Sequence, residues 1–211
     1  RVAASGTGRK GFAPNWKLAL GAMMLSTASG GFIFGAMTFV VPRYFEISMT
    51  SISTSVAITG LLASLVYATA SFSQIGVGWL IDRFSPKWVL FSLGLGQILF
   101  IFLAAQYTDY VLFFAMLVAM SFVFGQIPIT DTILSRYVPD EWRAKALSVK
   151  FMLNLTIGAT VLPICGVILQ SGSPMSSLFT LMSAVAIVVA LSGLMLPQQA
   201  DDQRRDMMPA E

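Results

Sequence analysis

Histidine is absent from the 211 residues, and cysteine occurs once, as Cys165. Without histidine, the chain has no Ser/His or Cys/His nucleophile pair, no imidazole metal site and no bis-histidine haem site of its own. A single cysteine excludes a disulfide within the chain, and because Cys165 lies in an apolar run, we expect a small buried apolar residue there. The composition therefore predicts neither a metal or other cofactor nor an enzyme built on these groups.

Charged residues are also scarce. They make up 11% of the chain, against about a quarter in an ordinary soluble domain, whereas 56% of the residues are hydrophobic. The charges gather in a few clusters with long uncharged stretches between them, as expected where a charge at mid-membrane costs roughly 3 kcal/mol. These features predict an integral membrane protein. The net charge of +3 comes from the connections between apolar stretches and does not indicate a nucleic-acid partner.

Six stretches are long and apolar enough to cross the bilayer, which takes about 20 helical residues. They are 18–41, 53–81, 88–105, 110–130, 146–169 and 175–196. We expect an all-α bundle of six transmembrane helices over residues 17–197, a cytoplasmic linker over 1–16 and a disordered cytoplasmic tail over 198–211. The chain opens without a methionine and without an apolar signal segment, so we expect that it begins inside a longer protein.

The Lys and Arg residues lie almost entirely on one side of these spans. Of the 13, only Arg43 lies in a connection on the side opposite to the two chain ends. Cytoplasmic connections of membrane proteins carry an excess of Lys and Arg. The segregation supports the count of six spans and predicts a multi-pass protein of the plasma or inner membrane with both ends in the cytoplasm.

Polar residues are distributed unevenly among the spans. The second span carries Tyr67, Ser71 and Gln74 at spacings of three or four, which places them on one helix face, and the fifth carries Lys150 and Asn154 one turn apart. The third and sixth spans are almost wholly apolar, so they can face lipid. For any one hydroxyl the alternative interpretation is an interhelical hydrogen bond, worth about 0.6 kcal/mol in a membrane.

The segment G-W-L-I-D-R-F-S-P-K at 78–87 resembles the loop signature G-x-x-x-D-R-x-G-R-R/K of the major facilitator superfamily, which joins the second and third helices of each six-helix half. Gly78, Asp82, Arg83 and Lys87 match, whereas a serine and a proline replace the second glycine and the next basic residue. Such degeneracy is typical of second halves, so the resemblance implies a C-terminal half. We expect Asp82 near the start of the fifth helix and Arg83 paired with Asp131, which would hold a cytoplasmic gate shut.

A second segment, 125–146, is similar to the region joining the tenth and eleventh helices of bacterial drug, sugar or organic-acid transporters of this superfamily. A Tyr-Val-Pro-Asp turn there precedes an Arg-x-x-Ala helix start, and Pro139 before Asp140 and Glu141 suits a helix N-terminus. In this family the first, second, fourth and fifth helices of each half line the central cavity. The polarity of the spans agrees with that arrangement.

The resemblance implies secondary active transport of a small solute by alternating access, with this chain as the C-terminal half of a twelve-helix transporter. The partners implied are the N-terminal half, the lipid bilayer and a small-molecule substrate, with a proton as a candidate coupling ion. Lys150 is expected toward the cytoplasmic mouth, where it attracts an anion or snorkels. Because no carboxylate is expected deep in a span, the acid for proton coupling is expected in the other half. The candidate cavity residues are Thr38, Tyr67, Ser71, Gln74, Gln126, Lys150 and Asn154, and the candidate residues of the cytoplasmic gate are Gly78, Asp82, Arg83, Lys87, Asp131 and Arg143.

Other classes of membrane protein fit the sequence less well. An intramembrane protease of the Ser-His kind lacks its histidine, and one of the aspartyl kind lacks paired carboxylates within the spans. The Asn-Pro-Ala repeats of water channels and a glycine-rich filter loop are absent from the sequence. The alternative that stays open is a self-standing six-helix protein acting as a homodimeric transporter, channel or scaffold. The fold does not fix the substrate, the direction of transport or the coupling ion.

Overall fold

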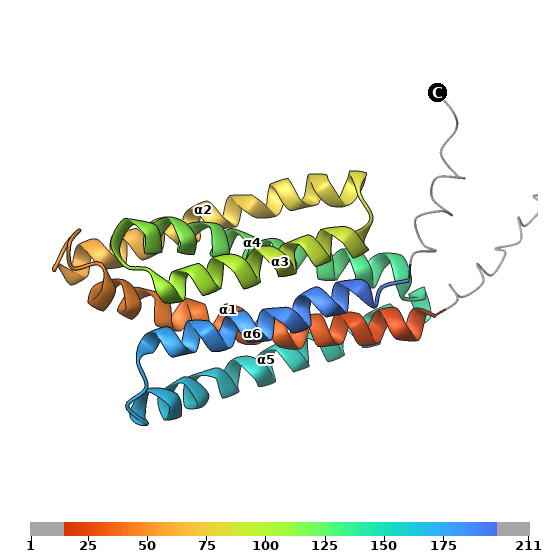
Figure 1. The fold of residues 1–211 in the computed structure, drawn as a ribbon. Helices are drawn as coiled ribbons and strands as arrows, with labels where there is room; N and C mark the ends of the chain where they lie inside the picture. Colours follow the sequence, from red (N-terminus) through yellow and green to blue (C-terminus); the bar gives the residue numbers. More distant parts are fainter. Residues whose placement is uncertain (1–14, 198–211) are drawn as a thin grey trace, which may run out of the picture.

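The computed structural model describes residues 15–197, which form six helices and no strand. The helices run antiparallel to their chain neighbours in one elongated bundle (Figure 1), and each is long and apolar enough to cross a membrane. The expected six-helix bundle is therefore confirmed, whereas the expected tail and all but the last residues of the expected linker lie outside the described part of the chain. The helices are α1 (Trp16–Ser48), α2 (Val56–Arg83), α3 (Pro86–Gln106), α4 (Asp109–Tyr137), α5 (Asp140–Gln170) and α6 (Met175–Leu194).

Two helices continue well beyond their apolar stretches. Helix α1 passes through Pro42 and ends at Ser48, and α4 passes Asp131 and ends at Tyr137. A proline inside a helix removes a single backbone hydrogen bond, which does not force the chain to stop there. Hydropathy marks the part of a helix that lies in hydrocarbon, but the backbone hydrogen bonds continue into the polar interface. As a result Asp131 lies within a helix and not in a connection.

The closest helix packing joins α3 to α6. A methyl group added at Gly94 would lie 2.6 Å from the backbone nitrogen of Ala190, and one added at Gly193 would lie 2.8 Å from the backbone nitrogen of Phe91. The hydroxyl of Ser183 also donates a hydrogen bond of 2.9 Å to the Ile98 carbonyl oxygen. Small residues on both helices therefore let the two backbones approach, the usual basis of helix association in membranes.

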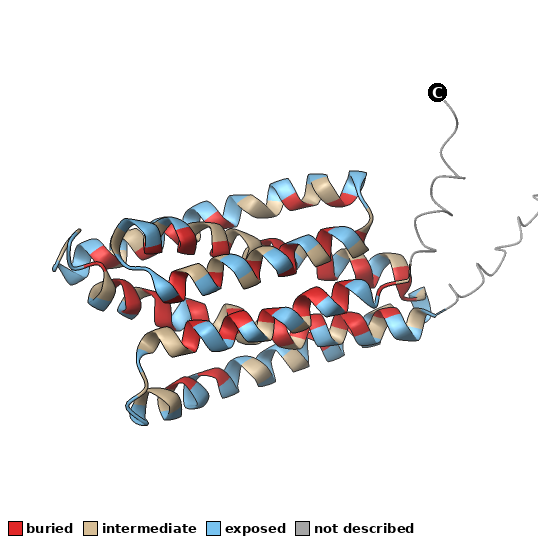
Figure 2. Cartoon of the chain, viewed as in Figure 1, coloured by how far each residue is buried: buried red, intermediate tan, exposed pale blue. Residues whose placement is uncertain are grey.

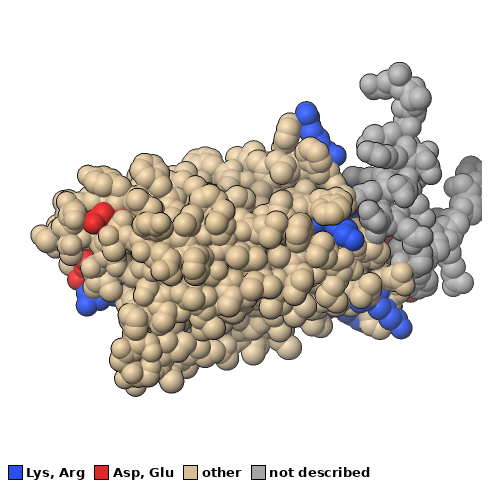
Figure 3. All heavy atoms as spheres, in the orientation of Figure 1, with Lys and Arg blue, Asp and Glu red and all other residues tan. Residues whose placement is uncertain are grey.

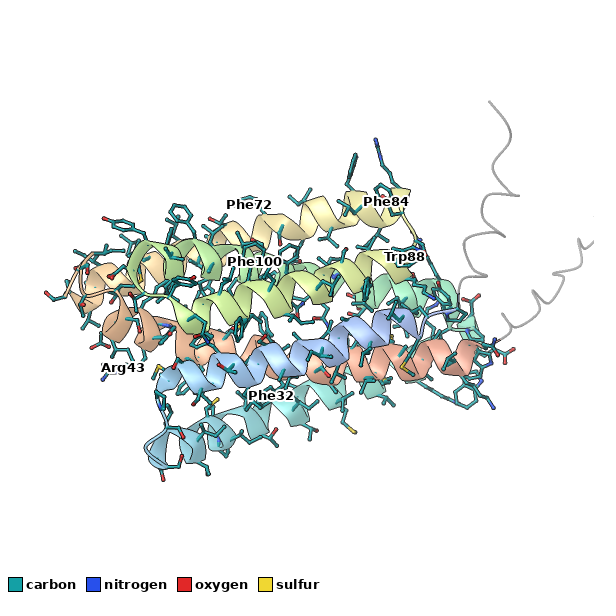
Figure 4. All side chains as sticks on the ribbon, viewed as in Figure 1. Phe32, Arg43, Phe72, Phe84, Trp88 and Phe100 are labelled. Atoms are coloured by element: carbon teal, nitrogen blue, oxygen red, sulfur yellow. The ribbon has the colours of Figure 1, made fainter. Side chains whose placement is uncertain are left out.

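Helices α2 and α5 are the least covered. Only 22% of the apolar stretch of α2 and 11% of that of α5 are buried, compared with 50% for α6 (Figure 2). Phe72 on the outer side of α2 is 71% exposed (Figure 4), and Leu155 on α5 is 73% exposed. The two helices in which the sequence concentrates polar side chains thus present broad uncovered faces.

The start of α1 and the end of α6 lie at the same end of the bundle (Figure 1), which is here named the cationic end. Lys and Arg gather there (Figure 3), whereas Arg43 lies at the opposite end (Figure 4), where it pairs with Glu46. All four tryptophans of the sequence also lie at the cationic end, near helix termini: Trp16, Trp79, Trp88 and Trp142. Tryptophan favours the interface between lipid and water, so this end is built as a membrane boundary.

Candidate binding pocket

A pocket of about 180 Å³ opens between α1, α4 and α5. Polar groups converge in it from all three helices, and Phe34 and Phe151 supply aromatic surface. A concave site with an apolar wall and a few convergent polar groups is the usual form of a small-molecule site. The polar side chains that line it are Ser26 and Thr27 from α1, Gln126, Thr130 and Asp131 from α4, and Lys150 and Asn154 from α5.

Lys150 and Asp131 form an ion pair at the pocket wall, in which the ammonium group of Lys150 donates to Oδ1 of Asp131. They are the only charged side chains among the described residues that line the pocket. The two partners differ in environment, because the side chain of Lys150 is 11% exposed and that of Asp131 is 56% exposed. The pair therefore joins a buried cation to an anion that faces outward.

Gln126 lies at the centre of a buried chain of hydrogen bonds. Its Oε1 accepts a hydrogen bond of 3.0 Å from Nε2 of Gln97, and its own Nε2 donates to the carbonyl oxygen and the hydroxyl of Ser26 at 2.9 and 2.8 Å. Both amide hydrogens of Gln126 are thus in use, and a methyl group at Gly30 would collide with this amide. The chain ties α3, α4 and α1 together behind the pocket.

Two polar side chains of the pocket have no hydrogen-bond partner within the described part of the chain. The Thr27 hydroxyl is buried and unpaired, and the Asn154 amide makes no hydrogen bond. Asn154 contacts α1, since a methyl group at Gly31 would lie 2.6 Å from its Oδ1. The buried Thr27 hydroxyl is costly unless something binds it, whereas the Asn154 amide is exposed. These groups give the pocket its free hydrogen-bonding capacity.

Three of the seven residues expected in the cavity line this pocket: Gln126, Lys150 and Asn154. The other four do not line it: Thr38, Tyr67, Ser71 and Gln74.

The hydroxyl groups among these four are engaged in bonds to helix backbone. The Tyr67 hydroxyl donates a hydrogen bond of 3.1 Å to the Thr38 carbonyl oxygen, and the Ser71 hydroxyl bonds to the Tyr67 carbonyl oxygen at 2.9 Å. A serine or threonine in a helix readily donates to the carbonyl four residues earlier, so a polar helix face need not face a cavity. The sequence analysis did not identify Ser26 and Thr27 as pocket residues. The signal available for them was the pair Gly30 and Gly31 one turn later in α1, which also lines the pocket.

The gate residues have different partners from those expected. Arg136 of α4 donates a hydrogen bond of 3.0 Å to the Ile81 carbonyl oxygen near the end of α2, and its guanidinium lies 3.9 Å from the Asp82 carboxylate. The sequence predicts Asp82 near the start of the fifth helix, and its ion-pair partner Arg136 lies four residues before that helix begins. The contact at the cationic end therefore joins α2 to α4.

The expected pairing of Arg83 with Asp131 is wrong. Asp131 pairs with Lys150, and the Arg83 guanidinium lies over the Trp79 ring, 4.0 Å from its centroid. The cause is the length of α4, which continues for six residues beyond Asp131 and moves that carboxylate away from the cationic end. Asp131 thus belongs to the pocket.

The remaining gate candidates are Arg143, Gly78 and Lys87. Arg143 forms an ion pair of 2.7 Å with Asp140 and donates a hydrogen bond of 2.8 Å to the Ser135 carbonyl oxygen, which fastens the turn between α4 and α5. A methyl group at Gly78 would meet nothing within 4 Å, so no neighbour in the described chain requires a glycine there. Lys87 lies one residue into α3.

Comparison with known proteins gives consistent results. A sequence model described as Major Facilitator Superfamily matches residues 18–206. Two solved structures have similar folds: a single-residue variant of the Escherichia coli fucose:proton symporter FucP, with a TM-score of 0.69 and 17% identity, and FucP, a Major Facilitator Superfamily transporter in the outward conformation, with a TM-score of 0.71 and 16% identity. Each likeness covers 87% of this chain but only 43% and 42%, respectively, of the other, so the chain spans less than half the length of these transporters. A search of curated sequences found no match.

Proposed function

The chain belongs to the major facilitator superfamily, and on that premise we propose that it is the C-terminal half of a secondary transporter that moves a small solute by alternating access. In this proposal the pocket between α1, α4 and α5 is half of the substrate site. A second set of six helices, the N-terminal half, supplies the opposite wall. Both chain ends lie in the cytoplasm, and the bundle spans the plasma or inner membrane.

The uncovered faces of α2 and α5 carry this proposal. They flank a bundle that is otherwise well packed, and α5 contributes three residues to the pocket while remaining the least buried helix. The similar chains are more than twice as long as the matched region, which leaves room for a second bundle against these faces. The degenerate loop signature at 78–87 supports the C-terminal assignment.

A coupling proton is part of the proposal because one of the similar structures is that of a fucose:proton symporter. The carboxylate in the described pocket, Asp131, is neutralised by Lys150. The titrating acid is therefore assigned to the N-terminal half.

The test is solute uptake by the full-length protein in proteoliposomes, driven by an imposed proton gradient or by counterflow. Accumulation of at least one small solute, abolished when the gradient is collapsed, supports secondary transport. A correctly folded protein that moves none of a broad panel of sugars, organic acids and amines contradicts it. Purification of two differently tagged copies tests the homodimer alternative, which predicts that the copies co-purify, whereas a complete twelve-helix monomer predicts that they do not.

A further inference from the structure

Lys150 is the most unusual side chain in the pocket. It lies ten residues into α5, roughly 15 Å from the helix start, and its side chain is only 11% exposed. A cation inside a transmembrane bundle is costly and persists only when an anion compensates it. The compensating anion, Asp131, is 56% exposed in the described chain, so it is far less enclosed than Lys150 and has room to turn away from it. The cation is fixed in the pocket, but its counter-ion is exchangeable.

Two hydrogen-bond donors that line the same pocket as Lys150 have no partner in the described chain. Asn154 follows it by one helical turn and so lies on the same face of α5, and Thr27 faces the pocket from α1 with a buried unpaired hydroxyl. The ammonium group of Lys150 has three N–H donors, of which Asp131 accepts one. The pocket therefore offers an ammonium group, an amide and a hydroxyl to one acceptor group of a ligand.

We propose that the pocket binds a small organic carboxylate whose anionic group pairs with Lys150 and accepts hydrogen bonds from Asn154 and Thr27. This inference rests on the proposed function, because it names the substrate class of the same site. When the carboxylate binds, Asp131 turns toward water and the ligand takes over the compensation of Lys150. A neutral solute gives Lys150 no replacement anion, and a cationic one is repelled by it.

The pocket volume sets how much of the carboxylate this half of the site can hold. A cavity of about 150 Å³ holds a benzene ring, and the pocket measures about 180 Å³. Phe34 and Phe151 line it as apolar surface for the carbon part of the ligand. A monocarboxylate of a few carbons, aliphatic or aromatic, fits these dimensions.

Binding is tested first, on the full-length protein in detergent, with sodium acetate as the probe and sodium chloride at equal ionic strength as the reference. Asp131→Asn leaves Lys150 without its anion, so acetate is expected to raise the melting temperature of this variant well beyond the chloride effect. The double variant Lys150→Met with Asp131→Asn is expected to lose this acetate-specific gain. Equal stabilisation by acetate and chloride in Asp131→Asn, or an undiminished acetate gain in the double variant, overturns the inference.

Lys150→Met alone provides a variant that folds even if Asp131→Asn does not, since the carboxylate that it leaves behind is largely exposed. The dissociation constant for benzoate, measured by calorimetry, is expected to rise about tenfold or more, because a charge-assisted contact is lost. Lys150→Arg is expected to retain most of the affinity. Lys145→Met is the matched control, because Lys145 lies on the same helix over the Trp142 ring and outside the pocket. An unchanged affinity in Lys150→Met overturns the inference.

Transport distinguishes this inference from the proposed function. If the full-length protein moves a neutral solute and acetate and benzoate neither compete nor bind, the carboxylate site is wrong and secondary transport stands. If acetate binds through Lys150 but no solute crosses the membrane, the carboxylate site stands and the transport proposal fails.

Discussion

Gln97 of α3 donates a buried hydrogen bond of 3.0 Å to Gln126 of α4. Gln126 in turn donates to the carbonyl oxygen and the hydroxyl of Ser26 in α1. Oε1 of Gln97 is itself buried without a partner in the described chain. Since Gln126 has no free amide hydrogen, its first role is to join three helices, and the pocket surface that it provides is secondary. This relationship makes Gln126 a residue on which the stability of the bundle depends.

Gln126→Leu is therefore expected to destabilise the protein. The substitution removes the hydrogen bond between Gln97 and Gln126 and leaves the buried Ser26 hydroxyl without its partner, at a cost of about 1–3 kcal/mol of unfolding free energy. Unfolding in mixed detergent micelles measures this change. Gln106→Leu, at the exposed end of α3, is the matched control and is expected to have little effect. Equal stability of the two variants would show that the buried amide chain contributes nothing.

Gly94→Ala is expected to weaken the packing of α3 against α6. The new methyl group would lie 2.6 Å from the Ala190 backbone nitrogen, and overpacking of this kind costs about 1–3 kcal/mol. The control is Gly21→Ala in α1, where nothing lies within 4 Å and the better helix propensity of alanine gives a small gain. Melting temperatures of the two variants should move in opposite directions. A shift in the same direction for both would contradict the close approach of α3 and α6.

At the cationic end, Arg136→Ala is expected to destabilise the protein more than Asp82→Ala. The Asp82 side chain is 81% exposed, and an exposed ion pair is worth about 0–1 kcal/mol. Arg136 additionally donates to the Ile81 carbonyl oxygen, and a hydrogen bond from a charged group is worth about 1.5–3 kcal/mol. Unfolding free energies of the two variants measure the difference. A larger loss of unfolding free energy in Asp82→Ala than in Arg136→Ala would contradict the hydrogen bond from Arg136 to Ile81 as the main contact at the cationic end.

Membrane orientation gives a separate prediction. The connection at 49–55, next to the end that carries Arg43, is expected outside the cell, whereas the turn at 138–139 and both chain ends are expected in the cytoplasm. Alkaline phosphatase fused after residue 52 should be active, and a fusion after residue 138 should be inactive. Activity of the enzyme at both positions would contradict six spans with cytoplasmic ends.

The number and type of helices could be predicted from the sequence, because twenty apolar residues without a charge have one stable arrangement in a bilayer. The sequence also places Lys150 and Asn154 together correctly, since a spacing of four residues fixes them on one helix face. Partners between helices could not be predicted in this way. Arg83 and Asp131 have opposite charges, but which side chains meet depends on how far each helix continues past its apolar stretch.

The hydrogen-bond partners of the hydroxyl groups could not be predicted from the sequence either. Ser71 and Thr38 are polar and lie at positions that fit a cavity face. Each hydroxyl, however, donates to a backbone carbonyl oxygen of its own helix, that of Tyr67 and that of Phe34, respectively. Thr27, by contrast, has no such bond and lines the pocket with its hydroxyl unpaired. The difference lies in local geometry, which a helix pattern of polar and apolar residues does not contain.

Alternating access through the pocket is tested most directly by cysteine accessibility at Asn154, which is exposed within the pocket. The measurement uses Asn154→Cys in the full-length protein, with Cys165→Ala as the background and a membrane-impermeant thiol reagent applied to right-side-out and to inside-out vesicles. Alternating access predicts that the introduced thiol is labelled from both faces. Labelling from one face only, under all gradients and solutes applied, would contradict it.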